Sequence, residues 1–193
     1  MRIVPRVGDF VIDGLPVLRV AGPLDDRCRA ELLACLSFGP QRTVHQDAPF
    51  GLQQIVDIAL KALSPGVHDP TTAITCIDRL GGLMVMMASR DVPGTFRSSH
   101  GVLRVIAEGP DFASMLALSF DAISDHAADH VEVHASLLAT LGRIAAATAS
   151  EARRRQVGAQ IELVLRSAAR AGLAPWRQAA LEQQASAVRR LVP

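Results

Sequence analysis

The sequence contains no tyrosine and a single tryptophan, and aromatic side chains make up only 4 % of its 193 residues. The chain therefore has few aromatic side chains on which bases or sugar rings could stack. The formal net charge is +1, which argues against a protein that holds nucleic acid through a strongly basic surface. The best largely apolar run, at 80–88, has about half the length of a membrane span, so no spanning helix is predicted in this chain.

The low cysteine content and the absence of common motifs exclude further classes of protein. Three cysteines are too few for a disulfide framework, and none of them forms a C-x-x-C pair. We expect all three to be small buried side chains. The sequence has no phosphate-binding glycine loop, no dinucleotide fingerprint, no H-E-x-x-H and no G-x-S-x-G motif, so the common nucleotide, zinc-protease and hydrolase sites lose their main support. No cofactor and no metal site is therefore predicted.

The composition and the first twenty residues favour a folded chain that starts with strands. Hydrophobic residues make up 49 % and charged residues 20 % of the chain, which is typical of a globular domain. Residues 1–20 are rich in β-forming side chains separated by turn pairs such as Asp13-Gly14. Short strands are predicted at 2–7, 10–12 and 17–20.

From residue 24 onward, apolar side chains recur with the helical period, interrupted by one β-hairpin at 95–106. Helices are predicted at 24–38, 49–64, 70–90, from 111 onward, 130–148, 151–171 and 175–191. The fold class is therefore mainly α: a bundle of about seven helices with a short N-terminal β segment and one central β-hairpin. As domains we expect a β appendage at 1–22 and one helical globular unit at 23–193.

The clearest helix start lies at residues 69–70. Asp69 is predicted to cap the helix and Pro70 to occupy its first position, because an aspartate side chain accepts the free N–H groups of a first turn. Gly81 and Gly82 weaken the middle of this helix by up to ~1 kcal/mol each relative to alanine. The glycine pair suggests close packing against a neighbouring helix.

Two polar segments, 42–47 and 64–72, carry the densest group of side chains that could do chemistry. If the helices at 49–64 and 70–90 form an antiparallel pair, the loop joining them lies at one end of it, where free N–H groups attract an anion. The predicted ligand-binding residues are Arg42, Gln46, Lys61, Ser64, Asp69, Thr71, Thr72 and Arg79. The candidate acid–base residues are His68 and His45, oriented by Asp47 or Asp57.

The alternative for these two segments is a structural role. Asp69 already caps the N–H groups that would attract an anion. Asp57 and Lys61 are four residues apart on one predicted helix, so they can pair with each other. The remaining polar residues are then loop and cap residues.

Three histidines, at 126, 130 and 134, have a spacing that could place them around a metal ion on one continuous helix. However, Asp129 followed by Glu132 has the pattern of a helix start, which would separate His126 from the other two. His134 also falls on the apolar stripe of its helix, as a core histidine does. We therefore predict that these histidines do not form one tight metal site.

The stretch QDAPFGLQQIVDIALKALSPGVHDPTTA, at 46–73, resembles the signature of a bacterial family of predicted membrane proteins, the family of domain of unknown function 2254. The segment GDFVIDGLP, at 8–16, is similar to the part that follows the membrane region in that family. The resemblance implies no established activity or catalytic residue. It does imply a shared polar core at Asp47, Asp57, Ser64, Pro65, Asp69, Pro70, Thr71 and Thr72.

Two positions depart from the family pattern. Position 61 is commonly arginine and is Lys61 here, and position 68 is commonly asparagine and is His68 here. Because a histidine titrates near neutral pH and can bind metal, His68 opens an acid–base role that asparagine lacks.

From the residues and the resemblance together, we expect a soluble ligand-sensing or interaction domain with a polar pocket for a small anionic or polar metabolite. One alternative is a small enzyme that uses a His/Asp acid–base pair in the same pocket, and another is a structural assembly domain. A homo-oligomer is compatible with each of them. Since the family typically carries a membrane region before this domain, the expected location is the cytoplasm, or the soluble part of an inner-membrane protein.

Overall fold

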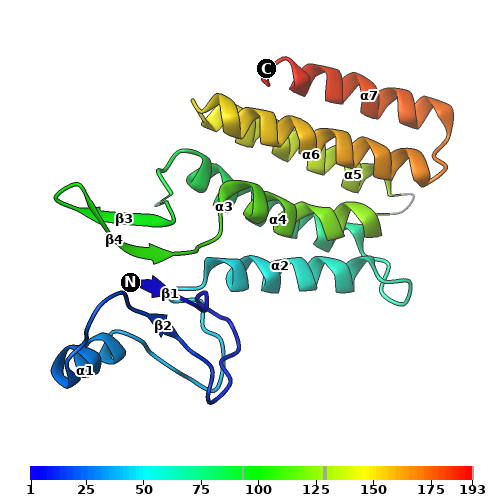
Figure 1. The fold of residues 1–193 in the computed structure, drawn as a ribbon. Coiled ribbons are helices and arrows are strands. Elements are labelled where there is room, and N and C mark those ends of the chain that lie inside the picture. The colour runs from blue at the N-terminus through cyan, green and yellow to red at the C-terminus, as the bar shows by residue number, and fades with distance from the viewer. Residues whose placement is uncertain (93, 128–129, 193) are drawn as a thin grey trace. The chain divides into compact units, whose positions relative to one another are not determined.

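The computed structural model describes residues 1–92, 94–127 and 130–192. Over these residues it is mainly α, as the apolar periodicity predicts (Figure 1). The strands are β1 (Arg2–Ile3), β2 (Leu18–Arg19), β3 (Phe96–Ser99) and β4 (Val102–Ala107). The helices are α1 (Asp26–Ala34), α2 (Ala48–Leu63), α3 (Pro70–Ala88), α4 (Phe112–His126), α5 (Val131–Ala147), α6 (Glu151–Arg170) and α7 (Pro175–Arg189).

The chain divides into two units. The sheet unit comprises Met1–Phe50 and Pro93–Gly109, and the helical unit comprises Gly51–Val92 and Pro110–Pro193. The expected division at residue 22 differs from this one, because residues 23–50 and the hairpin group with the N-terminal strands.

The four strands of the sheet unit form one mixed sheet in the order β2-β1-β4-β3. β1 runs parallel to β4, and the other neighbouring pairs are antiparallel. The predicted hairpin is confirmed: it turns at His100 and Gly101, whose φ angles of 51° and 75° suit a two-residue turn between twisted strands. The pairing of β1 with β4 joins segments that lie far apart in the sequence.

Two expectations for the first forty residues are wrong. Residues 10–12 form no strand; they are exposed, and backbone turns closed by Asp9 and Leu15 flank them. The helix expected at 24–38 is the shorter α1, because Asp25 accepts the N–H of Cys28 and fixes its start. No residue of α1 is buried.

The expectation that all three cysteines are buried is wrong for two of them. Cys28 and Cys35 are exposed, whereas Cys76 is buried in α3. The reason is that no residue of α1 is buried, so neither Cys28 within the helix nor Cys35 at its C-terminal cap lies against a core. Burial raises the pKa of the Cys76 thiol.

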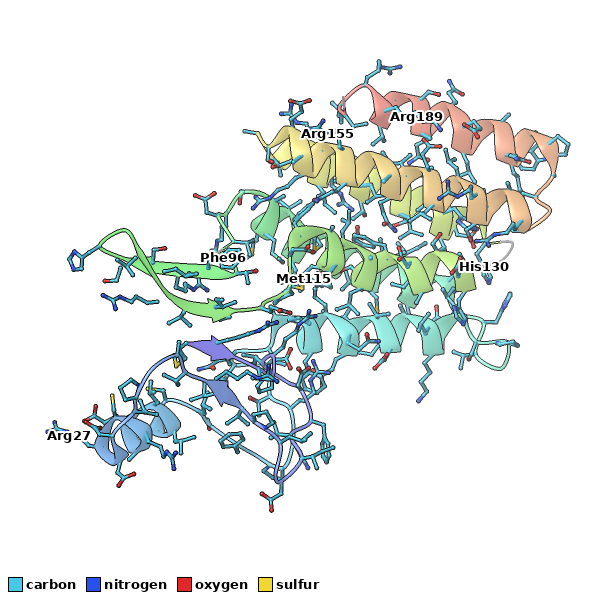
Figure 2. All side chains as sticks on the ribbon, viewed as in Figure 1. Arg27, Phe96, Met115, His130, Arg155 and Arg189 are labelled. Carbon is cyan, nitrogen blue, oxygen red and sulfur yellow. The ribbon has the colours of Figure 1, made fainter. Side chains whose placement is uncertain are left out.

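α5 lies at the centre of the helical unit, where it contacts α3, α4, α6 and α7 (Figure 1). Its stripe residues Leu137, Leu138, Leu141 and Ile144 have no exposed surface. Each such side chain contributes roughly 1.5–3 kcal/mol when it leaves water. In Figure 2, Met115 of α4 belongs to the same core.

α3 approaches α5 closely at Gly81. A β-carbon at this position would lie 2.5 Å from Cγ2 of Thr140, whereas a β-carbon at Gly82 would meet nothing within 4 Å. The close packing expected for the glycine pair is therefore confirmed at Gly81 alone.

α3 ends against an arginine of α6. The run of arginines at 153–155 has the composition of a solvated helix face, but Arg153 donates to the carbonyls of Met87 and Ala88, at 3.4 and 2.9 Å. Its guanidinium also lies 5.4 Å from the centre of the Phe112 ring. Arg155 is the exposed member of the run (Figure 2). Arg153 thus satisfies carbonyl groups that the end of α3 leaves free.

Among the described residues, one helix, α3, is long and apolar enough to cross a membrane by length and composition alone. The run of apolar residues at 80–88 did not predict this. Its side chains Ile77, Leu80 and Met84 are fully buried in the helical unit. A buried core helix passes the same test, so the result is weak evidence for a membrane span.

Candidate functional site

The two polar segments singled out in the sequence lie at opposite ends of α2. Segment 42–47 precedes its first residue, and the loop at 64–69 follows its last. The 16 residues of α2 span about 24 Å at a rise of 1.5 Å per residue. The candidate residues therefore fall into two places: Arg42, His45, Gln46 and Asp47 before α2, and the others along it or beyond it.

Asp47 is the best-defined polar group of the sheet unit, with 2 % of its surface exposed. One carboxylate oxygen accepts the N–H of Phe50 at 3.0 Å, and the other accepts the Nε–H of Arg42 at 2.8 Å. The Arg42 guanidinium also lies 4.8 Å from the centre of the Phe50 ring. Arg42, Asp47 and Phe50 form a closed cluster, in which the two opposite charges neutralise each other.

The protonation state of Asp47 supports a structural role. Burial by itself would raise its pKa, but the hydrogen bonds from Arg42 and Phe50 outweigh burial, and the pKa lies below its ordinary value. The same hydrogen bond raises the pKa of Arg42. Asp47 is therefore ionised at neutral pH, which suits a fixed ion pair better than proton transfer.

Gly8 is part of the same cluster, and the site prediction did not include it. Its φ is +89°, and a β-carbon at this position would collide with Oδ2 of Asp47. Only glycine therefore fits here, because both the backbone conformation and the space exclude a side chain. The available signal was the Gly8-Asp9 turn pair within the family-like start at 8–16.

The loop after α2 is stabilised by hydrogen bonds within the loop and to the last turn of α2. The Ser64 hydroxyl donates to the carbonyl of Lys61 at 2.7 Å, and the Ser64 carbonyl accepts the N–H groups of Val67 and His68 at 3.0 and 2.9 Å. The N–H of Asp69 reaches the carbonyl of Ala62 at 2.8 Å. Carbonyls at the end of α2 are thus satisfied inside the loop.

His68 occupies an unusual backbone conformation in this loop. Its φ is +52°, in the left-handed region. Among residues with a side chain, asparagine is one of the few that adopt this region readily, and histidine also occurs there more often than most. This conformation is a backbone reason for the asparagine that the family resemblance implies at position 68.

Asp69 caps α3 as predicted, with Pro70 in the first turn. Its carboxylate accepts the N–H of Thr72 at 3.0 Å and the hydroxyl of Thr72 at 2.6 Å. These hydrogen bonds from Thr72 hold the pKa of Asp69 below its ordinary value. The first turn of α3 therefore already has an anionic partner from the chain itself.

The remaining candidates do not converge on these caps. Asp57 accepts a hydrogen bond from Nε2 of Gln53 at 2.7 Å, and it forms no ion pair with Lys61 among the described contacts. The Thr71 carbonyl accepts the hydroxyl of Thr75. The side chains of His45, Gln46, Lys61 and Arg79 are exposed.

The structure pairs His68 with a histidine that the sequence assigned to a different cluster. The ring centres of His68 and His130 lie 4.6 Å apart at an angle of 51°. Nδ1 of His130 lies 3.4 Å from a carboxylate oxygen of Glu132. His130 immediately precedes α5 and is labelled in Figure 2.

The other two histidines lie elsewhere. Nδ1 of His126 contacts the carbonyl of Ala122 at 2.8 Å, and His134 is buried in α5. The expected helix cap Asp129 lies outside the described residues, and α5 begins at Val131. Within the described parts of the chain, no group of three His, Cys, Asp or Glu side chains could hold a metal ion.

The sheet unit also contains two hollows that were not predicted. One, of about 580 Å³, is lined by residues 4–19, among them Phe10, Ile12 and Leu15. The other, of about 310 Å³, is lined by residues that include Arg2 and Arg104. The sequence could not indicate them, because the apolar residues of 7–15 have the composition of half-buried strands.

The fold and the site together define a mainly helical domain with a small mixed sheet, whose signature residues are caps and turns at both ends of one helix. The chain belongs to the family described as predicted membrane protein, domain of unknown function 2254, whose model matches residues 1–143. The resemblance of the segments 46–73 and 8–16 is thereby confirmed.

Three curated relatives support this assignment. Uncharacterized proteins of Mycobacterium tuberculosis (two strains) and Mycobacterium bovis are 38 % identical to this chain over 133 residues. The match covers 68 % of this chain and 26 % of each relative, so the chain spans about a quarter of their length. No solved structure matches the chain.

Proposed function

We propose that this chain is a non-catalytic interaction domain of its membrane protein family. The helical unit is the scaffold, and the sheet unit presents an apolar surface to a partner. The observation that carries this proposal is the burial pattern of the sheet unit: among its described residues, Asp47 alone is buried. Large apolar side chains, including Phe10, Leu15 and Phe38, are exposed instead. Of these, Phe10 and Leu15 line one hollow, and a contiguous exposed apolar patch marks an interaction site.

The signature residues support a structural rather than a ligand-binding role. Arg42 and Asp47 bind each other, and Asp69 binds Thr72. A small anion would have to displace one of these internal hydrogen bonds, at a cost of about 1–3 kcal/mol for each buried group left unsatisfied. We therefore place the functional surface in the sheet unit and assign the signature residues to the fold.

A second candidate function rests on the contact between His68 and His130. Two imidazoles in contact, with their rings inclined to each other and one of them near the carboxylate of Glu132, could bind a cationic or polar ligand or transfer a proton. This pair would be the centre of the ligand-sensing or enzymatic alternatives.

Thermal-shift measurements separate the two candidates. For an interaction domain, phosphate, small carboxylates and Zn²⁺ leave the Tm unchanged. A ligand at 100 times its Kd adds roughly 2.7 kcal/mol, which raises the Tm by several degrees. Such a rise, lost in the His68→Asn variant, would favour the second candidate and overturn the first.

Fluorescence of a dye that binds apolar surface tests the proposal directly. The native chain should bind the dye, and Phe10→Ser should lower that binding. Ile58→Ser is the matched control, because Ile58 is also exposed, at 54 %, but lies on α2 in the helical unit. A native chain that binds no dye, or an equal loss in both variants, would contradict an interaction surface on the sheet unit.

A further inference from the structure

The two hollows of the sheet unit adjoin each other at Arg19, which lines both. Apolar side chains, among them Phe10, Ile12 and Leu15, line most of the larger hollow. The smaller one is lined by Arg2, Arg19 and Arg104 together with apolar side chains such as Leu103 and Ile106. Three arginines therefore gather around a hollow that is otherwise apolar and adjoins the larger one at Arg19. We name the loop at 7–15 the apolar loop, and Arg2, Arg19 and Arg104 the arginine face.

The strand register places Arg2 and Arg19 on one face of the sheet, and Arg104 lines the same hollow as both of them. Arg2 of β1 lies directly opposite Arg19 of β2 in an antiparallel pair. Arg2 is also aligned with Ile106 of β4. Arg104 lies at a β-bulge of β4, where the register with β3 shifts, and it lines the same hollow as Arg2 and Arg19. Like charges directly opposite each other destabilise a sheet.

The chain neutralises this positive charge only in part. Arg2 donates to Glu108 at 2.7 Å, and Arg6 donates to the other oxygen of the same carboxylate at 3.1 Å. These two hydrogen bonds lower the pKa of Glu108, which is therefore fully ionised at neutral pH. Among the described ion pairs, none involves Arg19 or Arg104. The arginine face therefore carries excess positive charge.

Hydrogen bonds from backbone N–H groups to aspartate side chains stabilise the turns of the apolar loop. Asp9 accepts the N–H of Arg6 at 2.7 Å, and Asp13 accepts the N–H of Gly14 at 3.0 Å. Both loop carboxylates thus bind the backbone, while Phe10 is 91 % exposed, Leu15 61 % and Ile12 55 %.

We propose that the apolar loop and the arginine face together dock onto a membrane that contains anionic phospholipid. The apolar side chains enter the boundary between headgroups and acyl chains, and the arginines bind the lipid phosphates. This inference rests on the proposed interaction function and names its partner. The printed description of the family as a predicted membrane protein agrees with it.

Charge and exposure favour a lipid surface over two other occupants. A second copy in a two-fold contact would bring the same excess positive charge into the interface from both sides, because both copies use the same patch. A single enclosed ligand would cover the apolar side chains, yet Phe10 protrudes almost completely. A bilayer offers negative headgroups for the arginines and an apolar layer for Phe10 at once.

Sedimentation with lipid vesicles tests the proposal. The full chain should bind vesicles of phosphatidylcholine mixed with phosphatidylglycerol, bind pure phosphatidylcholine vesicles far less, and release as salt rises. Arg19→Gln and Arg104→Gln should each weaken binding about fivefold, the effect of about 1 kcal/mol per basic residue near an anionic surface. Arg166→Gln, an exposed arginine of α6 in the helical unit, should leave binding unchanged.

The apolar half has its own variants. Phe10→Ser should weaken vesicle binding, whereas the control Ile58→Ser should not. Both side chains are exposed, so circular dichroism and the Tm should remain those of the native chain.

The contrary outcomes are distinct. Equal binding to both kinds of vesicle, or equal losses in Arg19→Gln and Arg166→Gln, overturns the proposal. No vesicle binding, while the chain still binds the apolar dye, rejects the membrane and keeps the interaction domain; self-association that Phe10→Ser abolishes would then identify a second copy as the partner. No dye binding removes the proposed function itself.

Discussion

At the scale of single residues, neighbouring positions in the loop after α2 act in different ways. Asp69 acts through its side chain, which holds the first turn of α3. His68 acts through its backbone, whose φ of +52° lets the chain turn into that helix. The two positions therefore respond differently to substitution.

Replacing Asp69 by alanine should lower the Tm by about 2–4 °C, because the cap of α3 is lost. Asp69→Asn should keep most of the stability, since asparagine caps equally well. Thermal melts of both variants measure this. A Tm that is unchanged in Asp69→Ala would contradict the capping role.

The cap that Asp69 forms with Thr72 should also depend on pH. Hydrogen bonds from Thr72 lower the pKa of Asp69 in the folded state. The ionised carboxylate therefore contributes stability above its unfolded pKa of about 3.9, and this contribution is lost as the pH falls through the lower folded pKa. The difference in Tm between the native chain and Asp69→Ala should therefore shrink below about pH 4.

Replacing His68 by asparagine should leave the Tm unchanged or raise it, because asparagine adopts positive φ more readily. His68→Val should lower the Tm, since a β-branched residue at positive φ is strained. Denaturant melts of the two variants decide this prediction. A His68→Asn variant that unfolds would show that the imidazole itself holds the loop.

At the scale of elements, the packing of α3 depends on two small features. Gly81 lets α5 approach, and Arg153 of α6 binds the carbonyls of Met87 and Ala88 at its end. Both features place a buried core helix accurately, and each predicts a separate loss of stability.

The glycine pair offers a matched comparison. Gly81→Ala should destabilise the chain by about 1–3 kcal/mol, because the new β-carbon would overlap Cγ2 of Thr140. Gly82→Ala meets open space and should stabilise by up to about 1 kcal/mol. Thr140→Ser removes the methyl group and should reduce the loss in Gly81→Ala. Urea unfolding of the singles and the double variant measures the coupling, and additive effects would refute this contact.

Arg153→Ala should cost about 1–2 kcal/mol of unfolding free energy, because two carbonyls at the end of α3 lose a charged donor. Arg155→Ala is the control: Arg155 is exposed, and its contact with Glu151 is long, at 3.9 Å. Equal effects of the two substitutions would show that the carbonyl contacts contribute nothing.

At the scale of the whole molecule, the two units differ in how many of their side chains are buried. The helical unit encloses a large apolar core around α5. Among the described residues of the sheet unit, only Asp47 is buried. Phe96 on β3 illustrates the exposure of the sheet unit (Figure 2). Local stability follows the density of buried apolar contacts.

Hydrogen exchange should therefore separate the units. Amides of α5 should exchange only through global unfolding, whereas amides of residues 7–15 should exchange rapidly. Mass spectrometry of peptides after timed exchange measures both. If anionic vesicles slow the exchange of 7–15 and leave α5 unchanged, the docking proposal gains an independent measurement. Equal protection of both segments in the free chain would contradict the difference in burial.

The sequence by itself determined the helices and the caps of this chain. The helical period predicts α2 and α3 almost to the residue, and Asp69-Pro70 predicts the start of α3, because these signals involve neighbours along the chain. The family could likewise be identified from the segments 46–73 and 8–16. These properties depend on local spacing and on residue identity, which the sequence states directly.

Only the tertiary structure decided which side chains are buried and which segments meet. It paired β1 with β4 and brought His68 into contact with His130. It also left residues 10–12 exposed and brought the backbone of Gly8 close to Asp47. Each of these outcomes depends on how segments distant in the sequence pack. The identity of an apolar residue does not indicate whether such a segment covers it. For that reason the sequence could indicate the polar signature, while the exposed apolar loop became visible only in the fold.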